Sequence, residues 1–260
     1  MDLEGKSAIV TGSSSGIGAA IAVELSERGC SIAVNYSRNR KGAEEVAARC
    51  REKGAQAITV QADVSRDSDC QKLVDAAAEN FGSLEILVNN AGTTKFCRHQ
   101  DLSGLDKQDF MDIYEVNLVG PFQMTRAAEA ALRQAETAHI VNMGSIAALT
   151  GVGSSVAYAA SKGALVTMTL SLARVLGPQI RVNAVCPGFV AGEWLKKGLG
   201  EEAYETIKNQ YEQAAPLNKT ATPETVAQTV AALVGGADLT TGETLIIDGG
   251  MHLHTAPLGR

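Results

Sequence analysis

Tyr158 and Lys162 form a pair whose side chains could carry out acid–base chemistry. They stand four residues apart in the stretch YAASK, whose other members are small. On a helix, residues i and i+4 lie on the same face, one turn apart. A phenol ordinarily has a pKa near ~10, and a neighbouring cation stabilises the phenolate and lowers that pKa. Taken alone, the same spacing also describes a packed ring beside a solvated charge.

The glycine-rich stretch TGSSSGIG at residues 11–18 could bind a phosphate. It follows the apolar run SAIV and precedes a helical pattern, so it occupies a strand-to-helix junction. Gly12 allows a tight turn, Gly16 lets the backbone approach a pyrophosphate, and Gly18 lets the helix pack near the sheet. The helix N-terminus offers free N–H groups to the anion. A flexible connection is the alternative, but the junction favours dinucleotide binding.

These residues must be positioned by strands that alternate with helices along the chain. We expect strands at 7–10, 31–34, 57–60, 84–90, 139–143, 180–185 and 244–248. We expect helices at 16–28, 40–53, about 66–80, 106–135, from about 156, and from Pro223 with Thr222 as N-cap. This alternation predicts an α/β fold with a doubly wound parallel sheet and helices on both faces. Residues 1–260 then form a single domain, with a less regular insertion at about 188–216 that holds one or two short helices.

The composition is that of an ordinary globular protein and argues against several classes of function. Hydrophobic residues make up 45% of the chain, charged residues 20% and aromatics only 4%, so aliphatic side chains must fill the core. The net charge of −6, without a basic run, argues against a nucleic-acid partner. Five scattered cysteines argue against a disulfide framework or zinc site and fit the cytoplasm. We find neither a leader pattern nor an apolar run of ~18 residues, so we predict neither export nor a membrane span.

Together, these motifs resemble the short-chain dehydrogenase/reductase family over nearly the whole chain. The resemblance rests on GxxxGxG at 12–18, Asp63–Val64, NNAG at 89–92, Asn117, Ser145, YxxxK, CPG at 186–188 and DGG at 248–250. Each motif is common alone, but their order and spacing are specific jointly. The family implies a seven-stranded Rossmann-type sheet, a nicotinamide cofactor and carbonyl/alcohol chemistry.

The resemblance implies catalytic roles for four residues. Tyr158 would exchange the proton with the substrate oxygen, and Lys162 would lower the pKa of Tyr158 and bind the nicotinamide ribose. Ser145, which lies thirteen residues before Tyr158, would polarise the carbonyl as an oxyanion donor does. Asn117, a poor helix former inside a predicted helix, would bend that helix and hold a water linked to the lysine.

The predicted cofactor is NADP(H), with NAD(H) less favoured. NAD sites usually have an acidic residue at the end of the second strand, where this chain has Tyr36, followed by Arg38. Arginine can pair with a 2′-phosphate that a carboxylate would repel. On the other side, Arg38 and Arg40 could be solvated loop charges, and Ser15 stands where many NADP-dependent members have a basic residue.

The family-like positions also predict the other cofactor contacts. Asp63 and Val64 would border the adenine, and the NNAG stretch would pass beside the adenosine ribose, although asparagines in turns are also common caps. Gly192 stands where the family usually has a threonine that binds the cofactor carboxamide. The full predicted cofactor set is Gly12, Ser14, Ser15, Gly16, Ile17, Gly18, Tyr36, Arg38, Asp63, Val64, Asn89, Ala91, Gly92, Tyr158, Lys162, Pro187, Gly188 and Val190. No metal site is predicted, because His252 and His254 in the tail are a weak signal.

The substrate should lie beyond the carboxyl ends of the strands, near Ser145 and residues 93–96. The insertion at 188–216 would cover it and contains the only tryptophan, Trp194. An aromatic in such a loop indicates a largely apolar pocket that closes over the cofactor. An equal alternative is that Trp194 packs on its own domain or at a subunit contact.

The sequence therefore predicts an NADP(H)-dependent oxidoreductase acting on a small, partly apolar ketone or secondary alcohol. One alternative is a 3-oxoacyl-[acyl-carrier-protein] reductase, the subgroup that the chain resembles most. The segments at 134–138 and 176–179 lack the basic residues that this subgroup tends to present to its carrier. A non-catalytic dinucleotide sensor and a sugar epimerase are further alternatives, and the epimerase pattern TGxxGxxG is not found. Because family members are commonly tetramers, a homotetramer formed through the helices at 106–135 and 157–176 is expected.

Overall fold

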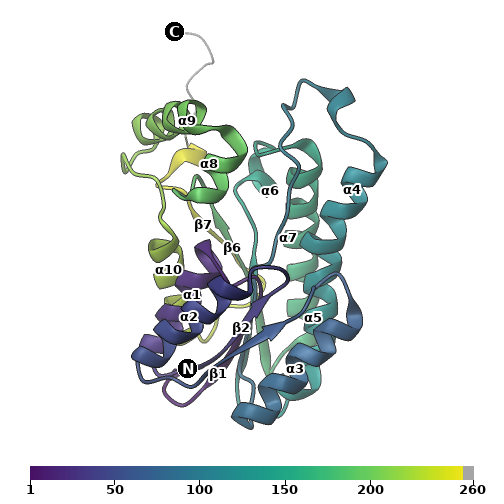
Figure 1. Cartoon of the computed structure of the whole chain (residues 1–260), viewed down its shortest axis with the longest axis vertical. Coiled ribbons are helices and arrows are strands. Elements are labelled where there is room, and N and C mark those ends of the chain that lie inside the picture. Colours follow the sequence, from purple (N-terminus) through teal and green to yellow (C-terminus); the bar gives the residue numbers. More distant parts are fainter. Residues whose placement is uncertain (254–260) are drawn as a thin grey trace.

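The computed structural model describes residues 1–253 and contains a seven-stranded parallel sheet (Figure 1). Its strands are β1 (Ser7–Val10), β2 (Ser31–Tyr36), β3 (Ala57–Gln61), β4 (Ile86–Asn89), β5 (Ala138–Met143), β6 (Ile180–Pro187) and β7 (Thr244–Ile247). They are ordered β3-β2-β1-β4-β5-β6-β7, and every neighbouring pair is parallel. The predicted doubly wound fold is confirmed, with the reversal of strand order between β1 and β4.

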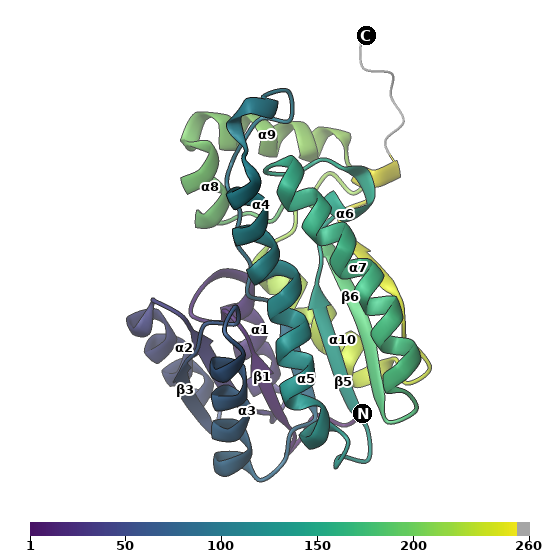
Figure 2. The ribbon, with the colours of Figure 1, turned by 90° about the vertical axis from the view of Figure 1, so that its right-hand side faces the viewer.

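Helices cover both faces of this sheet, and aliphatic side chains fill the two spaces between. One layer consists of α1 (Gly16–Glu27), α2 (Arg40–Glu52) and α10 (Pro223–Gly236), and the other of α3 (Asp67–Phe81), α5 (Gly120–Leu132) and α7 (Val156–Leu176). The second layer faces the viewer in Figure 2. Ile32, Val34 and Val230 lie in the buried cluster of the first side, and Leu87 and Ile140 in that of the second. Burial on both faces explains why the strands read as continuous apolar runs.

The helix expected at 106–135 contains a widened turn that the sequence pattern did not reveal. It begins as α4 (Lys107–Tyr114), passes through a π-helical turn (Glu115–Val119) and continues as α5. Asn117 lies in this turn and is fully buried. Single π-helical turns inside helices occur frequently at functional sites. The poor helix propensity of asparagine was the available signal, but propensity does not distinguish a bend from a π-helical turn.

Three further helices lie at the carboxyl ends of the strands. They are α6 (Ala147–Thr150), which the sequence analysis missed, and α8 (Glu193–Leu199) and α9 (Glu201–Ala214), which occupy the irregular segment between β6 and α10. Figure 1 shows α8 and α9 in green at the same end of the molecule as α6. Short 3-10 turns lie at Leu102–Gly104 and Met251–Leu253. Thr222 caps α10 as predicted, since its hydroxyl accepts from the N–H of Thr225.

Contrary to the sequence expectation, one helix is long and apolar enough to cross a bilayer when judged by length and composition. This is α7, which has a mean hydropathy of 1.2 over eighteen residues. Core helices of globular proteins pass the same test. In this structure α7 packs against α6, α4 and β6, which buries part of its apolar surface, while Leu170 and Val175 remain exposed.

Replacing Ile140 with alanine should destabilise the fold strongly, because its side chain is fully buried in the centre of β5. A cavity of this type costs about 2–5 kcal/mol in the free energy of unfolding. Urea unfolding followed by circular dichroism measures this quantity. The control is Leu239→Ala, at a fully exposed side chain, whose expected change is within about 0.5 kcal/mol. Equal effects of the two substitutions would contradict the described core.

Candidate active site

The glycine-rich loop makes a sharp turn between β1 and α1. Gly12 and Gly16 have φ values of +62° and +58°, in the left-handed region that favours glycine. A Cβ on Gly12 would lie 2.9 Å from the Cα of Ala91, whereas open space surrounds the Cβ position of Gly16. Gly12 is therefore required by close packing against the segment after β4. Gly16 is required by its backbone conformation, beside space that a ligand could occupy.

Asn90, rather than Asn89, holds this loop. Its Nδ2 donates to the carbonyl oxygens of Thr11 (2.9 Å) and Gly12 (3.2 Å). A Cβ on Gly18 would lie only 2.4 Å from that Nδ2, so the glycine lets α1 pack closely against the loop and Asn90. The side chain of Asn89 is buried and donates to Asn142 Oδ1 on β5 (2.9 Å). Any contact of Asn89 with a cofactor would therefore involve its main chain.

Asn35 on β2 supports the loop from the other side. Its Oδ1 accepts from the N–H of Gly12 (2.9 Å), its Nδ2 donates to the carbonyl of Ala62 (3.0 Å), and its main chain pairs with Ser13. The sequence analysis did not identify Asn35, whereas it left open a capping role for the asparagines of NNAG, which include Asn90. A polar residue in the middle of a buried strand was the signal that could have identified Asn35, because buried amides need partners.

The N-terminus of α1 keeps its N–H groups available for an anion. Ser15 occupies the N-cap position without a side-chain cap bond, and the first turn contains no acidic residue. Ser15 is exposed and Ser14 partly buried, while Ile17 packs against the core. The uncapped first turn and the positive end of the helix dipole suit a phosphate group.

The loop after β2 brings Arg38 beside the glycine-rich loop. Asn39 Nδ2 lies 3.5 Å from the carbonyl of Ser14, which joins the two loops. Arg40 pairs with Glu44 (2.7 Å) and Lys41 approaches Glu45 (3.8 Å), but Arg38 has no ion pair within residues 1–253. Tyr36 is buried in the core, whereas Arg38 is exposed. The loop therefore presents one guanidinium that no carboxylate neutralises.

Asp63 and Val64 follow β3 and are held by nearby protein groups. Asp63 Oδ1 accepts from the main-chain N–H (3.1 Å) and the hydroxyl (2.7 Å) of Ser65. Val64 is buried, and a Cβ on Gly120 would lie 2.8 Å from its side chain. The carboxylate of Asp63 retains Oδ2 for an outside donor.

Asn117 and Lys162 come together on either side of Gly92. A Cβ on Gly92 would lie 3.4 Å from Asn117 Oδ1 and 3.8 Å from Lys162 Nζ. Asn117 accepts from the N–H of Thr93 (2.8 Å) and donates to its carbonyl (3.0 Å) and to Ser161 Oγ (3.0 Å). The buried Lys162 donates to the carbonyl of Met143 at the end of β5 (2.7 Å). The end of β4, the π-helical turn and α7 are thereby joined.

Tyr158 and Ser145 meet at the start of α7. Ser155 caps this helix by accepting from the N–H of Tyr158 (3.2 Å), so Tyr158 lies in the first turn. Ser145 follows β5, where its Oγ accepts from the N–H of Ala147 (3.2 Å), and its hydroxyl acts to lower the pKa of the Tyr158 phenol. The Nζ of Lys162 lies 5.7 Å from the centre of the Tyr158 ring. The four predicted catalytic side chains therefore converge at the carboxyl ends of β4 and β5.

Burial dominates the electrostatics of this group. It raises the pKa of Tyr158 to about 12, with a further increase from Cys186 and a lowering by the hydrogen bond to Ser145. Burial lowers the pKa of Lys162 to about 8. Desolvation of the phenolate is the largest cause of the Tyr158 shift. The lowering of this pKa by Lys162 stays a prediction.

The predicted residues at and after the end of β6 lie beside the segment that follows β5. Pro187 accepts from the N–H of Ile146 (2.9 Å), and a Cβ on Gly188 would lie 2.6 Å from the Cβ of Asp248. Val190 pairs with residue 221 in an isolated parallel bridge. Gly192 has an extended backbone (φ 164°) and open space at its Cβ position. The structure therefore leaves room for the threonine that the family usually has there.

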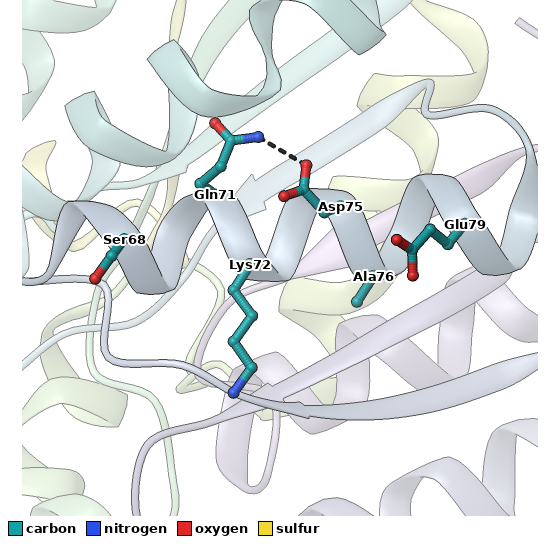
Figure 3. Close-up of a pocket in the computed structure, with 6 residues that line it drawn as sticks. All are labelled: Ser68, Gln71, Lys72, Asp75, Ala76 and Glu79. Atoms are coloured by element: carbon teal, nitrogen blue, oxygen red, sulfur yellow. Dashed lines mark hydrogen bonds between the residues drawn. The ribbon is translucent and has the colours of Figure 1, made fainter.

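Two other features lie outside this convergence. His252 bonds through Nδ1 and its main-chain N–H to Asp248, and His254 lies outside the described residues. A hollow of about 470 Å³ lies on the outer face of α3, where Gln71 donates to Asp75 (2.8 Å) beside Lys72 (Figure 3). It is lined by a single helix and contains none of the predicted site residues, so it is not the candidate site.

A family model described as enoyl-(acyl carrier protein) reductase matches residues 12–252. The chain is 40% identical over 246 residues to ketoacyl reductase 2 of the granaticin polyketide synthase of Streptomyces violaceoruber, covering 95% of this chain and 96% of that protein. It is 34% identical over 250 residues to the 3-oxoacyl-[acyl-carrier-protein] reductase FabG of Staphylococcus aureus, covering 95% and 98%.

Solved structures agree with these relatives. A short-chain dehydrogenase/reductase from Burkholderia xenovorans matches with a TM-score of 0.88 and 38% identity, over 95% of this chain and 98% of that one. NAD⁺-bound xylitol dehydrogenase matches with a TM-score of 0.88 and 29% identity, over 96% and 100%. Similarity in sequence and backbone over nearly the full lengths shows that this chain belongs to the short-chain dehydrogenase/reductase family of oxidoreductases.

Proposed function

We propose that the protein is an NADP(H)-dependent ketoreductase that transfers a hydride between the nicotinamide and a carbonyl or secondary alcohol of a small, partly apolar substrate. The convergence of Tyr158, Ser145 and Lys162 beside the glycine-rich loop carries this proposal. A phenol with a pKa of about 12 holds its proton at neutral pH, which suits the reductive direction. A non-catalytic sensor would not require this arrangement.

The residues around the loop fit a dinucleotide, which would supply the hydride when bound. The uncapped N-terminus of α1 and the open space at Gly16 would bind the pyrophosphate. Ser145 would donate to the substrate oxygen, and Tyr158 would donate its proton as negative charge develops there. Both groups act on the same oxygen, so hydride acceptance and protonation are coupled.

Lys162 and Asn117 would support this proton transfer. One N–H of Lys162 is used by Met143, which leaves two for the ribose hydroxyls. The two amide hydrogens of Asn117 both bond to protein atoms. Asn117 Oδ1 is therefore the side-chain atom left for the predicted relay water.

The unpaired Arg38 supports NADP(H) over NAD(H). Arg38 is exposed and precedes Asn39, which contacts the glycine-rich loop at Ser14, so a 2′-phosphate bound there could make two charge-assisted hydrogen bonds to its guanidinium. The NAD⁺-bound xylitol dehydrogenase shows that this fold also accepts the cofactor without that phosphate. Arg38 is the residue that we propose makes the distinction here.

A β-ketoacyl thioester is the second candidate substrate. Two relatives have names that include ketoacyl or 3-oxoacyl reductase. Against a carrier-bound substrate, the segments 134–138 and 176–179 are not basic. We therefore favour a free small ketone, with segment 188–216 as the covering loop.

We further propose a cytoplasmic homotetramer. Large apolar side chains remain exposed on the two helical segments expected at the interface. They are Met111 on α4, Val119 in the π-helical turn, Phe122 on α5, and Leu170 and Val175 on α7. Clusters of this kind mark protein contacts. The five cysteines are all free thiols, which fits a reducing compartment.

Replacing Tyr158 with phenylalanine should abolish the proton donor while retaining the ring. We expect turnover with a ketone panel to fall by about 10²- to 10⁴-fold, measured by absorbance of the reduced nicotinamide. Binding of the cofactor, followed by its fluorescence, should change little. Tyr114→Phe on α4 is the matched control and should retain activity. Retained turnover in Tyr158→Phe would exclude this residue as the acid.

Replacing Arg38 with alanine should weaken NADPH binding and leave NADH binding unchanged. Loss of charge-assisted hydrogen bonds to a phosphate predicts a weakening of about 10- to 100-fold, measured by fluorescence titration. Arg40→Ala is the control, since Arg40 is already paired with Glu44. Wild-type preference for NADH would refute the assignment.

The pH dependence should report the lowered pKa of Lys162. Protonated Lys162 predominates below its pKa of about 8 and is lost as pH rises through that value. The kcat/KM for NADPH should therefore be level below pH 8 and decrease above it, by up to about ten-fold per pH unit. Lys162→Arg, whose side chain keeps its charge, should remove this inflection from any residual activity. A wild-type profile that stays level to pH 10 would contradict the required charge.

A further inference from the structure

Two aromatic side chains from distant parts of the chain, Trp194 and Phe96, form a row with Tyr158, the proposed acid. The ring centres of Tyr158 on α7 and Trp194 on α8 are 6.2 Å apart, and those of Trp194 and Phe96 are 5.4 Å apart. Both pairs are tilted, at 45° and 53°. Trp194 therefore lies between Tyr158 and the segment that follows β4.

Gly198 determines where Trp194 lies. It is four residues after Trp194, so the two share one face of α8. A Cβ on Gly198 would lie 2.0 Å from atoms of the Phe96 ring, so any larger residue would displace the helix or the ring. Because Gly198 has no side chain, α8 can pack directly on Phe96. This packing places Trp194 beside Tyr158.

Phe96 is itself tied to the segment in front of α7. The N–H of Cys97 donates to the carbonyl of Ser154 (2.9 Å), and the hydroxyls of Thr94 and Ser154 are 2.7 Å apart. The neighbouring Gly153 packs on Tyr158, since a Cβ there would lie 3.3 Å from ring atom Cδ1. Phe96 and Tyr158 are therefore both positioned by residues 153–154.

Despite these contacts, 49% of Trp194 remains exposed, and its ring centre lies 6.2 Å from that of Tyr158, the residue that would protonate the substrate. An exposed indole is covered favourably by an apolar group. Aromatic pairs gain further free energy from offset or edge-to-face contact, which a saturated ring does not provide. The exposed part of the ring thus favours a flat, unsaturated neighbour for the reacting carbonyl.

We propose that Trp194, seated on Phe96, is a specificity-determining residue that selects ketones whose carbonyl lies next to a planar aromatic or conjugated ring. This inference rests on the proposed ketoreductase function and adds the class of substrate. It also means that segment 188–216, which would cover the substrate, helps to select which ketones are reduced.

The test compares two ketones with the same ten-carbon skeleton. In 2-tetralone the ring fused to the cyclohexanone is aromatic, whereas in trans-2-decalone it is saturated, and neither carbonyl is conjugated. The kcat/KM of both is measured with NADPH for wild type, Trp194→Leu and Trp194→Phe. Lys197→Ala, an exposed position on the same helix, is the control. Acetoacetyl-coenzyme A is reduced in parallel to report the chemistry independently of the ring.

Wild type and Lys197→Ala should share a preference for 2-tetralone. Trp194→Leu should reduce this preference by about three- to ten-fold, the contribution of one aromatic contact. Trp194→Phe should retain most of it, because a flat ring remains. An enzyme that reduces acetoacetyl-coenzyme A but shows the same ratio in wild type and Trp194→Leu overturns the selective role alone. An enzyme that reduces none of the three compounds overturns the proposed function as well.

Discussion

The hydroxyl of Thr11 joins the ends of the two strands on which the whole site depends. It accepts from the main-chain N–H groups of Asn90 (2.9 Å) and Ala91 (3.0 Å), and it lies 3.3 Å from the carbonyl of Val88. Strand order reverses between β1 and β4, so the ends of these two strands lie side by side. The hydrogen bonds of the Thr11 hydroxyl therefore hold the glycine-rich loop close to the segment after β4. Gly12 and Ala91 can then pack at van der Waals distance.

The same segment leads from the cofactor side to the catalytic side. Gly92 is the next residue, and Asn117 and Lys162 lie close around it. Thr93 is then held by the Asn117 side chain. The phosphate loop and the acid–base group are thus linked through three consecutive residues, so a displacement of one would be transmitted to the other. This rigidity matters because catalytic groups act efficiently only when held in the productive geometry.

Burial controls the chemistry of the acid–base pair. Desolvation disfavours charge on either group, so it raises the pKa of the phenol and lowers that of the ammonium. The two shifts bring Lys162 near physiological pH and keep the proton on Tyr158. A sequence motif shows only that a cation stands one turn from a phenol, and it does not show how deeply either group lies in the protein. The direction depends on how much protein surrounds each group, which only the packed structure determines.

Much of the fold followed from the sequence, because its signals are local. Apolar runs of four to eight residues, buried on both faces, identified the strands, and the cap at Thr222 placed the start of α10 correctly. The glycines of the loop were identified by their pattern at a strand-to-helix junction, and the positive φ values of Gly12 and Gly16 agree with that prediction. By contrast, α6 has only four residues and no strong periodicity. The π-helical turn at Asn117 depends on bonds to Thr93 and Ser161, which are distant in sequence.

The sequence by itself determined the order of the elements, the phosphate loop and the identity of the acid–base pair, because each depends only on the types of residues within a short segment. Only the tertiary structure decided that Asn35 and Asn90 support the loop, that Arg38 has no ion pair among residues 1–253, and that Trp194 lies beside Tyr158. These facts depend on contacts between residues about 20 to 80 positions apart. Such contacts form when strands and helices that are distant in the sequence pack together, so the pattern of a single segment cannot predict them.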